Sequence, residues 1–226
     1  MTFERDSAEP SGGLADLLVA VAAALAAERD VLNRLDGVAG DGDLGVTVSL
    51  ASDAIADVAL DIRGLTTPDA LRRVGTEIAR HAPSTSGTLV AFAFLAAGRI
   101  GAVDALNAGA RAVPYLEAAA QSIKERGKVA VGDRTMLDAL AAGVDAFRSA
   151  VERRESLGLT VVAAASAAND AAVATASMPA TVGRAAWLGD RARGNEDAGA
   201  RLVAMAFEAA AVHLSGETAP SQRTSR

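Results

Sequence analysis

Alanine dominates the apolar residues of this chain, and this constrains the fold more than any other feature of the sequence. Half of the 226 residues are hydrophobic, yet only 3% are aromatic. Alanine is the best helix former and its small side chain lets helices approach closely, while the β-branched residues typical of strands are scattered. No window shows sustained alternation of apolar and polar residues, so the sequence predicts an all-α protein.

Apolar residues at helical spacing predict eight helices. The first covers roughly 13–35, and the clearest is the sixth, which contains Leu137, Leu140, Val144, Phe147 and Val151 at steps of three or four. The others are expected over about 45–59, 68–81, 87–98, 103–125, 159–176 and 198–214. We expect one helical domain of residues 13–214, with disordered polar arms over 1–12 and 215–226.

The connections between these helices are mostly short, which predicts that neighbouring helices run antiparallel. In such an up-and-down array, the connections after the first, third, fifth and seventh helices lie at one end. These four hold the most unusual polar clusters of the chain: LDGVAGDGDLG, HAPSTSG, ERGKVAVGDRTM and MPATVGRAAWLGDRARGNEDAG. Polar, glycine-bearing loops that converge on one end of a helical bundle predict a ligand site there.

The first of these connections carries three carboxylates within eight residues, Asp36, Asp41 and Asp43, among glycines that let the backbone turn sharply. In an extended stretch, residues two apart point the same way, so Asp41 and Asp43 can face one point. Magnesium commonly takes a few carboxylates together with phosphate oxygens and water, which makes the loop a candidate magnesium site. A solvated acidic turn between two helices is the alternative.

Other known motifs fit these letters less well. GDGDLG matches the dinucleotide fingerprint G-x-G-x-x-G, but that fingerprint follows a strand, and a helix is predicted here. An EF-hand loop would need an acidic residue at Gly45 and a glutamate at Ser52. The chain has no G-x-x-x-x-G-K-[ST] and no cysteine, and its histidines are His81 and His213, so P-loop, thiolate, serine–histidine and zinc sites have little support.

The other three connections offer groups that suit a nucleotide. Ser84 to Thr88 place small hydroxyl residues where the fourth helix begins, which favours an anion site or, alternatively, an ordinary N-cap. Met136 can lie against a planar ring or belong to the core. The guanidinium of Arg184 suits a phosphate, with a solvated surface arginine as the alternative.

Charge and hydropathy exclude several classes of partner. The net charge of −6 argues against nucleic-acid binding. The N-terminus is polar and acidic where a secretory signal is basic and then apolar, and purely apolar runs fall short of the roughly 20 residues that span a membrane. We therefore expect a soluble, cytoplasmic protein without membrane or nucleic-acid contacts.

Taken together, the four connections resemble those of the L subunit, or nucleotide-binding domain, of dihydroxyacetone kinases. The family is known for the segments GD-x-DHG, G-A-S-G-P, GDKTM-D and GRASYLGER…G-x-x-DPGA. This chain reads GDGDLG, STSGT, GDRTMLD and GRAAWLGDRARGNEDAGA in the same order. The resemblance covers roughly residues 13–214 and implies a closed up-and-down barrel of eight antiparallel helices with a nucleotide site at one end.

The resemblance also implies ATP or ADP bound through two Mg²⁺ ions on Asp36, Asp41 and Asp43. It completes the nucleotide pocket with Leu44, Gly45, Val46, Thr47, Thr85, Ser86, Gly127, Met136, Arg184, Asp197, Ala198 and Gly199. It further implies a kinase subunit whose K-type partner subunit holds the ketose substrate on a histidine, with a phosphotransferase subunit as a further partner in some bacteria. We expect the chain alone to turn over little or no triose.

Three departures from the family pattern bear on activity. Leu44 replaces the usual histidine, Ala198 replaces a proline, and Thr85 and Thr88 alter the second segment. Leucine cannot form hydrogen bonds, so its presence removes a polar group expected beside the phosphates. The leucine favours an alternative in which the chain is a non-catalytic nucleotide-sensing or regulatory subunit that binds a protein partner. A helical bundle without a ligand is the third possibility.

Overall fold

The computed structural model describes residues 13–183, 186 and 194–216, and within these ranges it contains helices and no strand. The expected arm 1–12 and residues 217–226 of the expected tail lie outside the described residues. The helices are α1 (Gly13–Ala27), α2 (Arg29–Ala39), α3 (Leu44–Ile62), α4 (Thr67–His81), α5 (Thr85–Arg99), α6 (Ala108–Gly127), α7 (Met136–Glu152), α8 (Leu157–Ala174), the short 3₁₀ helix η1 (Thr175–Ser177) and α10 (Ala198–Ser215).

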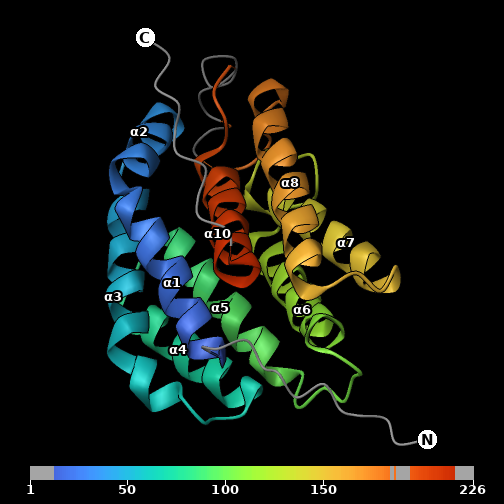
Figure 1. Ribbon diagram of the computed structural model, residues 1–226. Coiled ribbons are helices and arrows are strands. Elements are labelled where there is room, and N and C mark those ends of the chain that lie inside the picture. The colour runs from blue at the N-terminus through green and yellow to red at the C-terminus, as the bar shows by residue number, and fades with distance from the viewer. Residues whose placement is uncertain (1–12, 184–185, 187–193, 217–226) are drawn as a thin grey trace, which may run out of the picture.

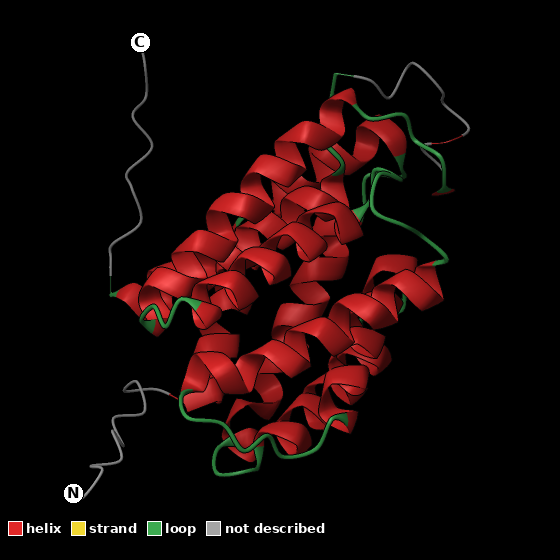
Figure 2. Cartoon of the chain, turned by 90° about the vertical axis from the view of Figure 1, so that its right-hand side faces the viewer, coloured by secondary structure: helices red, strands yellow, loops and turns green. Residues whose placement is uncertain are grey.

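Sequential helices pack side by side and close into a barrel (Figure 1). α3 packs against α1 and α4, α5 lies between α4 and α6, and α7 lies between α6 and α8. α10 packs against α7 and α8 and also against α1, so the last helix closes the ring on the first. The turned view shows the helices lying alongside one another, with loops gathered at the two ends of the barrel (Figure 2). The predicted all-α barrel is confirmed.

The first expected helix, 13–35, is two helices, because the chain turns at Glu28, whose φ of −94° and ψ of 16° interrupt the helix. Both pieces pack against α3 and α10, but their buried residues join different clusters. Ala15 and Ala22 of α1 join a cluster with residues of α3, α4 and α5, whereas Leu32 of α2 packs in a cluster with Leu202 of α10. The break lets α2 follow the curvature of the barrel toward the acidic loop.

α6 and α8 also differ from the expected bounds. α6 begins at Ala108 and not at 103, because the Asn107 side chain caps it by accepting a hydrogen bond of 2.8 Å from the Ala110 amide. The seventh expected helix, 159–176, starts earlier at Leu157 and tightens after Ala174 into η1.

Small residues let α7, α8 and α10 approach one another closely. Ala139 of α7, Ala164 of α8 and Ala204 of α10 are fully buried in one cluster. At Gly143 of α7 an added Cβ would lie 2.6 Å from the ring of Phe207, so the missing side chain makes room for that aromatic ring. The alanine-rich composition is thus used for close helix packing, as predicted.

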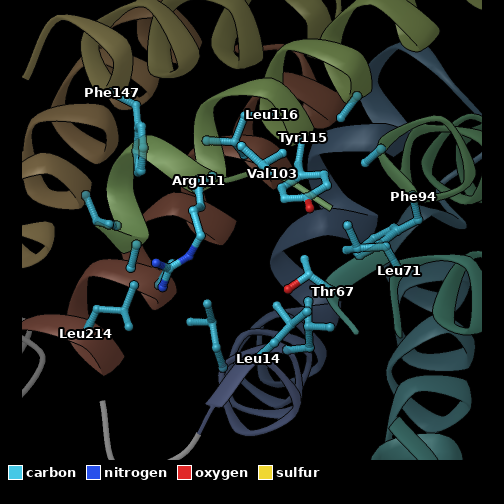
Figure 3. A pocket seen from close by; sticks show the side chains of 18 of the residues that line it. Leu14, Thr67, Leu71, Phe94, Val103, Arg111, Tyr115, Leu116, Phe147 and Leu214 are labelled. Atoms are coloured by element: carbon cyan, nitrogen blue, oxygen red, sulfur yellow. The ribbon is translucent and has the colours of Figure 1, made fainter. Parts of the chain in front are cut away.

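At the end of the barrel opposite the predicted site, the interior is not filled. A cavity of about 540 Å³ opens between the first turns of α1, α4, α6 and α8 and the last turns of α5 and α10. Its wall is mostly apolar, including Leu71, Phe94 and Phe147, with Tyr115 and Arg111 among its few polar groups (Figure 3). The Tyr115 hydroxyl donates a hydrogen bond of 2.7 Å to the Gly101 carbonyl.

One stretch of the described chain, Leu157–Ser177, is long and apolar enough by length and composition to cross a membrane. In the barrel this stretch packs against α7 and α10. Core helices of folded domains meet the same criterion, and the alanines of α8 form part of the main core cluster.

Candidate functional site

The described parts of the connections predicted to converge lie together at one end. The third and fourth are tied by two hydrogen bonds: Arg134 Nη2 donates to the Asn195 carbonyl over 2.9 Å, and Thr181 Oγ1 donates to Asp133 Oδ1 over 2.5 Å. The first and fourth meet through one apolar cluster that contains residues from the starts of α3 and α10. The second and third connections are also close to each other, since a Cβ added at Gly127, the last residue of α6, would lie 3.9 Å from Leu89 of α5.

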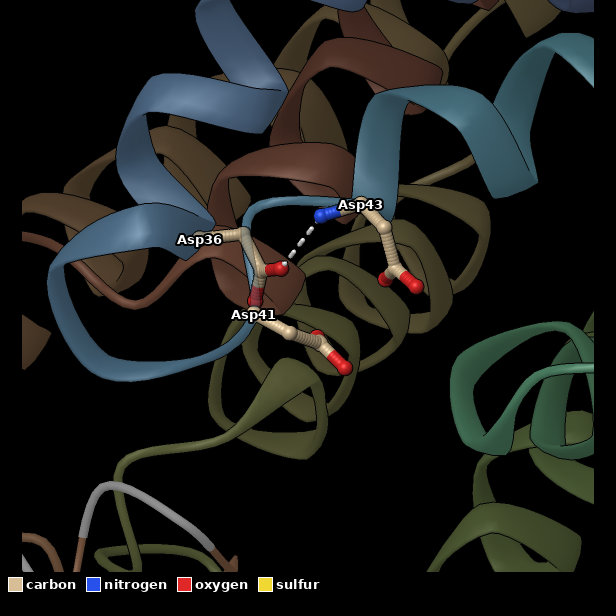
Figure 4. Close-up of side chains that lie close together, drawn as sticks. All are labelled: Asp36, Asp41 and Asp43. Atoms are coloured by element: carbon tan, nitrogen blue, oxygen red, sulfur yellow. Dashed lines mark hydrogen bonds between the residues drawn. The ribbon is translucent and has the colours of Figure 1, made fainter.

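Three carboxylates meet in the first connection. One oxygen from each of Asp36, Asp41 and Asp43 lies within 4.8 Å of the others. Asp36 is half-buried, and its Oδ2 accepts hydrogen bonds from the amides of Gly42 at 2.8 Å and Asp43 at 3.0 Å. The carboxylates of Asp41 and Asp43 project to the same side of the loop (Figure 4). Three carboxylates at this spacing suit a hard divalent cation.

Glycines shape this acidic loop at positions where a side chain would collide. A Cβ at Gly40 would lie 2.3 Å from Asp36 Oδ1, so the missing side chain leaves room for that carboxylate. Gly42 has a φ of +75°, which favours glycine. At Gly45 a Cβ would lie 2.0 Å from the Arg29 carbonyl oxygen, because the first turn of α3 packs directly on α2.

Residues 44–47 form the first turn of α3. The Gly45 amide donates to Asn33 Oδ1 at 2.7 Å, which fixes the start of α3 against α2. Leu44 is only 4% exposed and packs with Leu32, Val48, Ala198 and Leu202, so its side chain turns into the barrel wall. Thr47 is buried and Val46 is exposed. The backbone of this turn forms the positive end of the α3 dipole beside the carboxylates.

The second connection confirms the N-cap interpretation for one hydroxyl. Ser84 Oγ accepts a hydrogen bond of 3.0 Å from the Gly87 amide and caps α5. Thr85 and Ser86 follow in the first turn of the helix, where Thr85 is exposed and Ser86 is half-buried.

The third and fourth connections bring Met136, Gly199 and Asp197 together. A Cβ at Gly199 would lie 3.2 Å from Met136 Cβ and 3.2 Å from Asp197 Oδ1, so the starts of α7 and α10 are in contact. Met136 is 7% exposed, and Ala198 beside it is equally buried. Gly127 ends α6 on the same side of the barrel. Arg184 lies outside the described residues.

Asp197 has a strongly shifted pKa among the described residues of this end. Burial raises its pKa to about 6, and the charge of Asp138 also raises it. The hydrogen bond from the Ala200 amide and the charge of Arg134 lower the pKa and offset part of this effect. Asp197 Oδ1 accepts the Ala200 amide at 2.8 Å and thereby caps α10, and the Asp197 amide donates to Thr175 Oγ1 at 2.8 Å.

Sequence reasoning missed several residues that build the site. Asn33 holds the start of α3, Arg134 and Asp138 are buried beside Asp197, and Thr175 anchors its backbone. Thr135 and Asp138 form a capping box at the start of α7, which the spacing of Thr135 and Asp138 could have revealed. The burial of Arg134 has no signal in the sequence.

Comparison with known proteins gives matches over most of the chain. Residues 38–212 match the family described as DAK2 domain. L-erythrulose kinase of Pectobacterium atrosepticum is 34% identical over 207 residues, which cover 88% of this chain and 35% of that protein. The ADP-binding subunit DhaL of the PEP-dependent dihydroxyacetone kinase of Escherichia coli is 28% identical over 78% of this chain and 84% of that subunit. The chain therefore spans about a third of the first curated relatives and most of the separate subunit.

A solved structure shows the same architecture. The crystal structure of the dihydroxyacetone kinase of Citrobacter freundii in complex with AMP-PNP and Mg²⁺ matches 96% of this chain and 37% of that chain, with a TM-score of 0.70 and 27% sequence identity.

Proposed function

We propose, because this chain belongs to the DAK2 domain family, that it binds ATP or ADP with Mg²⁺ and serves as the phosphoryl-transfer subunit of a dihydroxyacetone-type kinase. The observation that carries the proposal is the cluster of Asp36, Asp41 and Asp43 at the start of α3, in an end of the barrel where α5, α7 and α10 also begin. Helix N-termini attract phosphates, and the carboxylates supply ligands for the cation that phosphates bring.

The residues present fit magnesium, and in this proposal Asp36, Asp41 and Asp43 would hold two such ions beside the phosphates. When bound, such ions neutralise charge that develops on the transferring phosphoryl group. Asp36 is held for this task by the amides of Gly42 and Asp43. In this proposal, the first turns of α3 and α5 contact the phosphates, Gly127, Met136 and residues 197–199 contact the nucleoside, and Arg184 contacts a phosphate.

The acceptor side of the reaction belongs to a partner in this proposal. A K-type subunit or domain would hold a triose or tetrose ketose and supply the base for its hydroxyl, so the chain alone would turn over little or no sugar. The similar relatives act on erythrulose or dihydroxyacetone according to their names, and the Escherichia coli relative is PEP-dependent. A phosphotransferase partner and a cytoplasmic location are part of the same proposal.

Removing Asp41 tests the metal assignment. Asp41→Ala is expected to abolish Mg²⁺-dependent ADP binding in calorimetric titration while the helical circular-dichroism signal persists, because Asp41 is exposed on the loop. Asp57→Ala, also exposed and on α3, is the matched control and should bind as wild type does. ADP binding of wild-type affinity by Asp41→Ala would refute the metal assignment.

A second candidate function is nucleotide sensing without catalysis, favoured by the leucine where the family carries histidine. The apolar packing of Leu44 leaves only its backbone available to a phosphate. Turnover assays with a K-type subunit separate the two functions: magnesium-dependent ADP binding without any turnover would support the sensing role.

A further inference from the structure

Arg134 is buried at the junction of the third and fourth connections and has no role in the function proposed so far. It is 3% exposed and directly precedes Thr135, the N-cap of α7. Its backbone has a φ of 62°, which is uncommon for a residue other than glycine. This left-handed conformation turns the chain just before α7 begins.

The guanidinium of Arg134 bridges two segments that lie far apart in the sequence. Nη2 donates to the Asn195 carbonyl over 2.9 Å, so the start of α7 is tied to the loop that leads into α10. A planar guanidinium presents its donors in a fixed fork, which positions such a loop more firmly than a flexible ammonium group.

The two segments that Arg134 joins each carry a carboxylate, buried Asp138 before α7 starts its second turn and half-buried Asp197 at the start of α10. Asp138 accepts hydrogen bonds from the amides of Gly132 and Thr135, and Asp197 accepts one from Ala200, so each carboxylate holds a turn of backbone. The charge of Arg134 acts on Asp197 directly. A carboxylate shielded from water is costly without a nearby cation, so the charge of Arg134 stabilises the ionised form of Asp197.

The segments that Arg134 joins carry the residues assigned to the nucleoside. Met136 starts α7 and Gly199 lies in the first turn of α10, in direct contact with each other. We propose that Arg134 is a positioning residue that holds these two helix starts in register, so that they recognise the base of the nucleotide. This proposal rests on the proposed nucleotide binding; Arg134 itself is too buried to touch the ligand.

Base selectivity separates this role from general structural support. Calorimetric titration with Mg²⁺-ADP and Mg²⁺-UDP compares two ligands that share the diphosphate and differ in the base. Wild type should prefer ADP. Arg134→Met keeps the aliphatic stem and removes the charge, and it should lower ADP affinity by about tenfold or more while UDP affinity stays within about twofold. Arg148→Met, at an exposed position of α7, should retain both affinities.

Two outcomes of these titrations would overturn the proposal. Equal affinity of wild type for ADP and UDP would mean that these helix starts do not read the base. An equal loss of both affinities, or no loss, in Arg134→Met would assign Arg134 a merely structural role or none. If Arg134→Met does not fold, Arg134→Lys decides, because it keeps the buried charge and loses the fork; it should lower ADP affinity selectively by about threefold. Failure of wild type to bind either nucleotide would instead refute the proposed function.

Discussion

Asp197 provides a quantitative test of the electrostatics at the site. Burial raises its pKa to about 6 from an ordinary value of 3.8, so the folded chain holds the proton more tightly than the unfolded chain does. This contribution to stability is fully present below the unfolded pKa and is lost as pH rises through about 6. A difference of about two pKa units corresponds to about 3 kcal/mol of unfolding free energy.

Replacement by asparagine removes the titration and preserves the cap. The amide oxygen of Asp197→Asn can still accept the hydrogen bond from Ala200 N, while no charge develops at high pH. We therefore expect the unfolding free energy of Asp197→Asn, relative to wild type, to increase between about pH 4 and pH 7, by an amount of up to about 3 kcal/mol.

Urea denaturation followed by circular dichroism at intervals of pH measures this difference directly. All other groups titrate in both proteins, so their contributions cancel when the two curves are subtracted. Asp53→Asn, at an exposed position of α3, is the control and should give a difference that does not change with pH. Parallel stability curves for wild type and Asp197→Asn would refute the reasoning, because they would mean that Asp197 titrates alike in the folded and unfolded chains.

Two further substitutions test the packing around the acidic loop. Gly45→Ala is expected to lower the melting temperature and weaken Mg²⁺-ADP binding, since its Cβ would meet the Arg29 carbonyl at 2.0 Å; Gly158→Ala, whose nearest contact is 3.6 Å, should do neither. Leu44→His buries an imidazole in an apolar cluster, and urea denaturation should show a loss of about 2–3 kcal/mol, against less than about 1.5 kcal/mol for Leu44→Met. Unchanged stability of either Gly45→Ala or Leu44→His would contradict the packing described here.

The fold could be predicted from the sequence because its determinants are local and repeated. The apolar positions from Leu137 to Val151 recur at helical spacing, and that segment is α7. Short connections then require antiparallel neighbours, which places alternate loops at the same end. The acidic loop could also be predicted from the sequence, because Asp36, Asp41 and Asp43 are close in the sequence and hydrogen bonds within eight residues set their geometry.

Features that depend on contacts between distant segments could not be predicted in this way. The burial of Arg134 requires the carbonyl of Asn195, 61 residues away. The inward direction of Leu44 depends on its packing with residues of α10, and the division of the buried residues of α1 and α2 between two clusters depends on contacts with distant helices as well. Likewise, alanine predicts close packing of helices but not the cavity at the end of the barrel opposite the site.

The helices α3, α5, α7 and α10 start at the site, and their first turns are capped in two different ways. Ser84, Thr135 and Asp197 each cap their own helix with a side-chain oxygen, which is the common arrangement. Asp43 occupies the same position before α3 but makes no such cap; Asn33 of α2 accepts the Gly45 amide in its place. A carboxylate that caps a helix is turned toward the first backbone amides of that helix. Because α2 takes over this task, the carboxylate of Asp43 can lie beside that of Asp41, where a cation would need it.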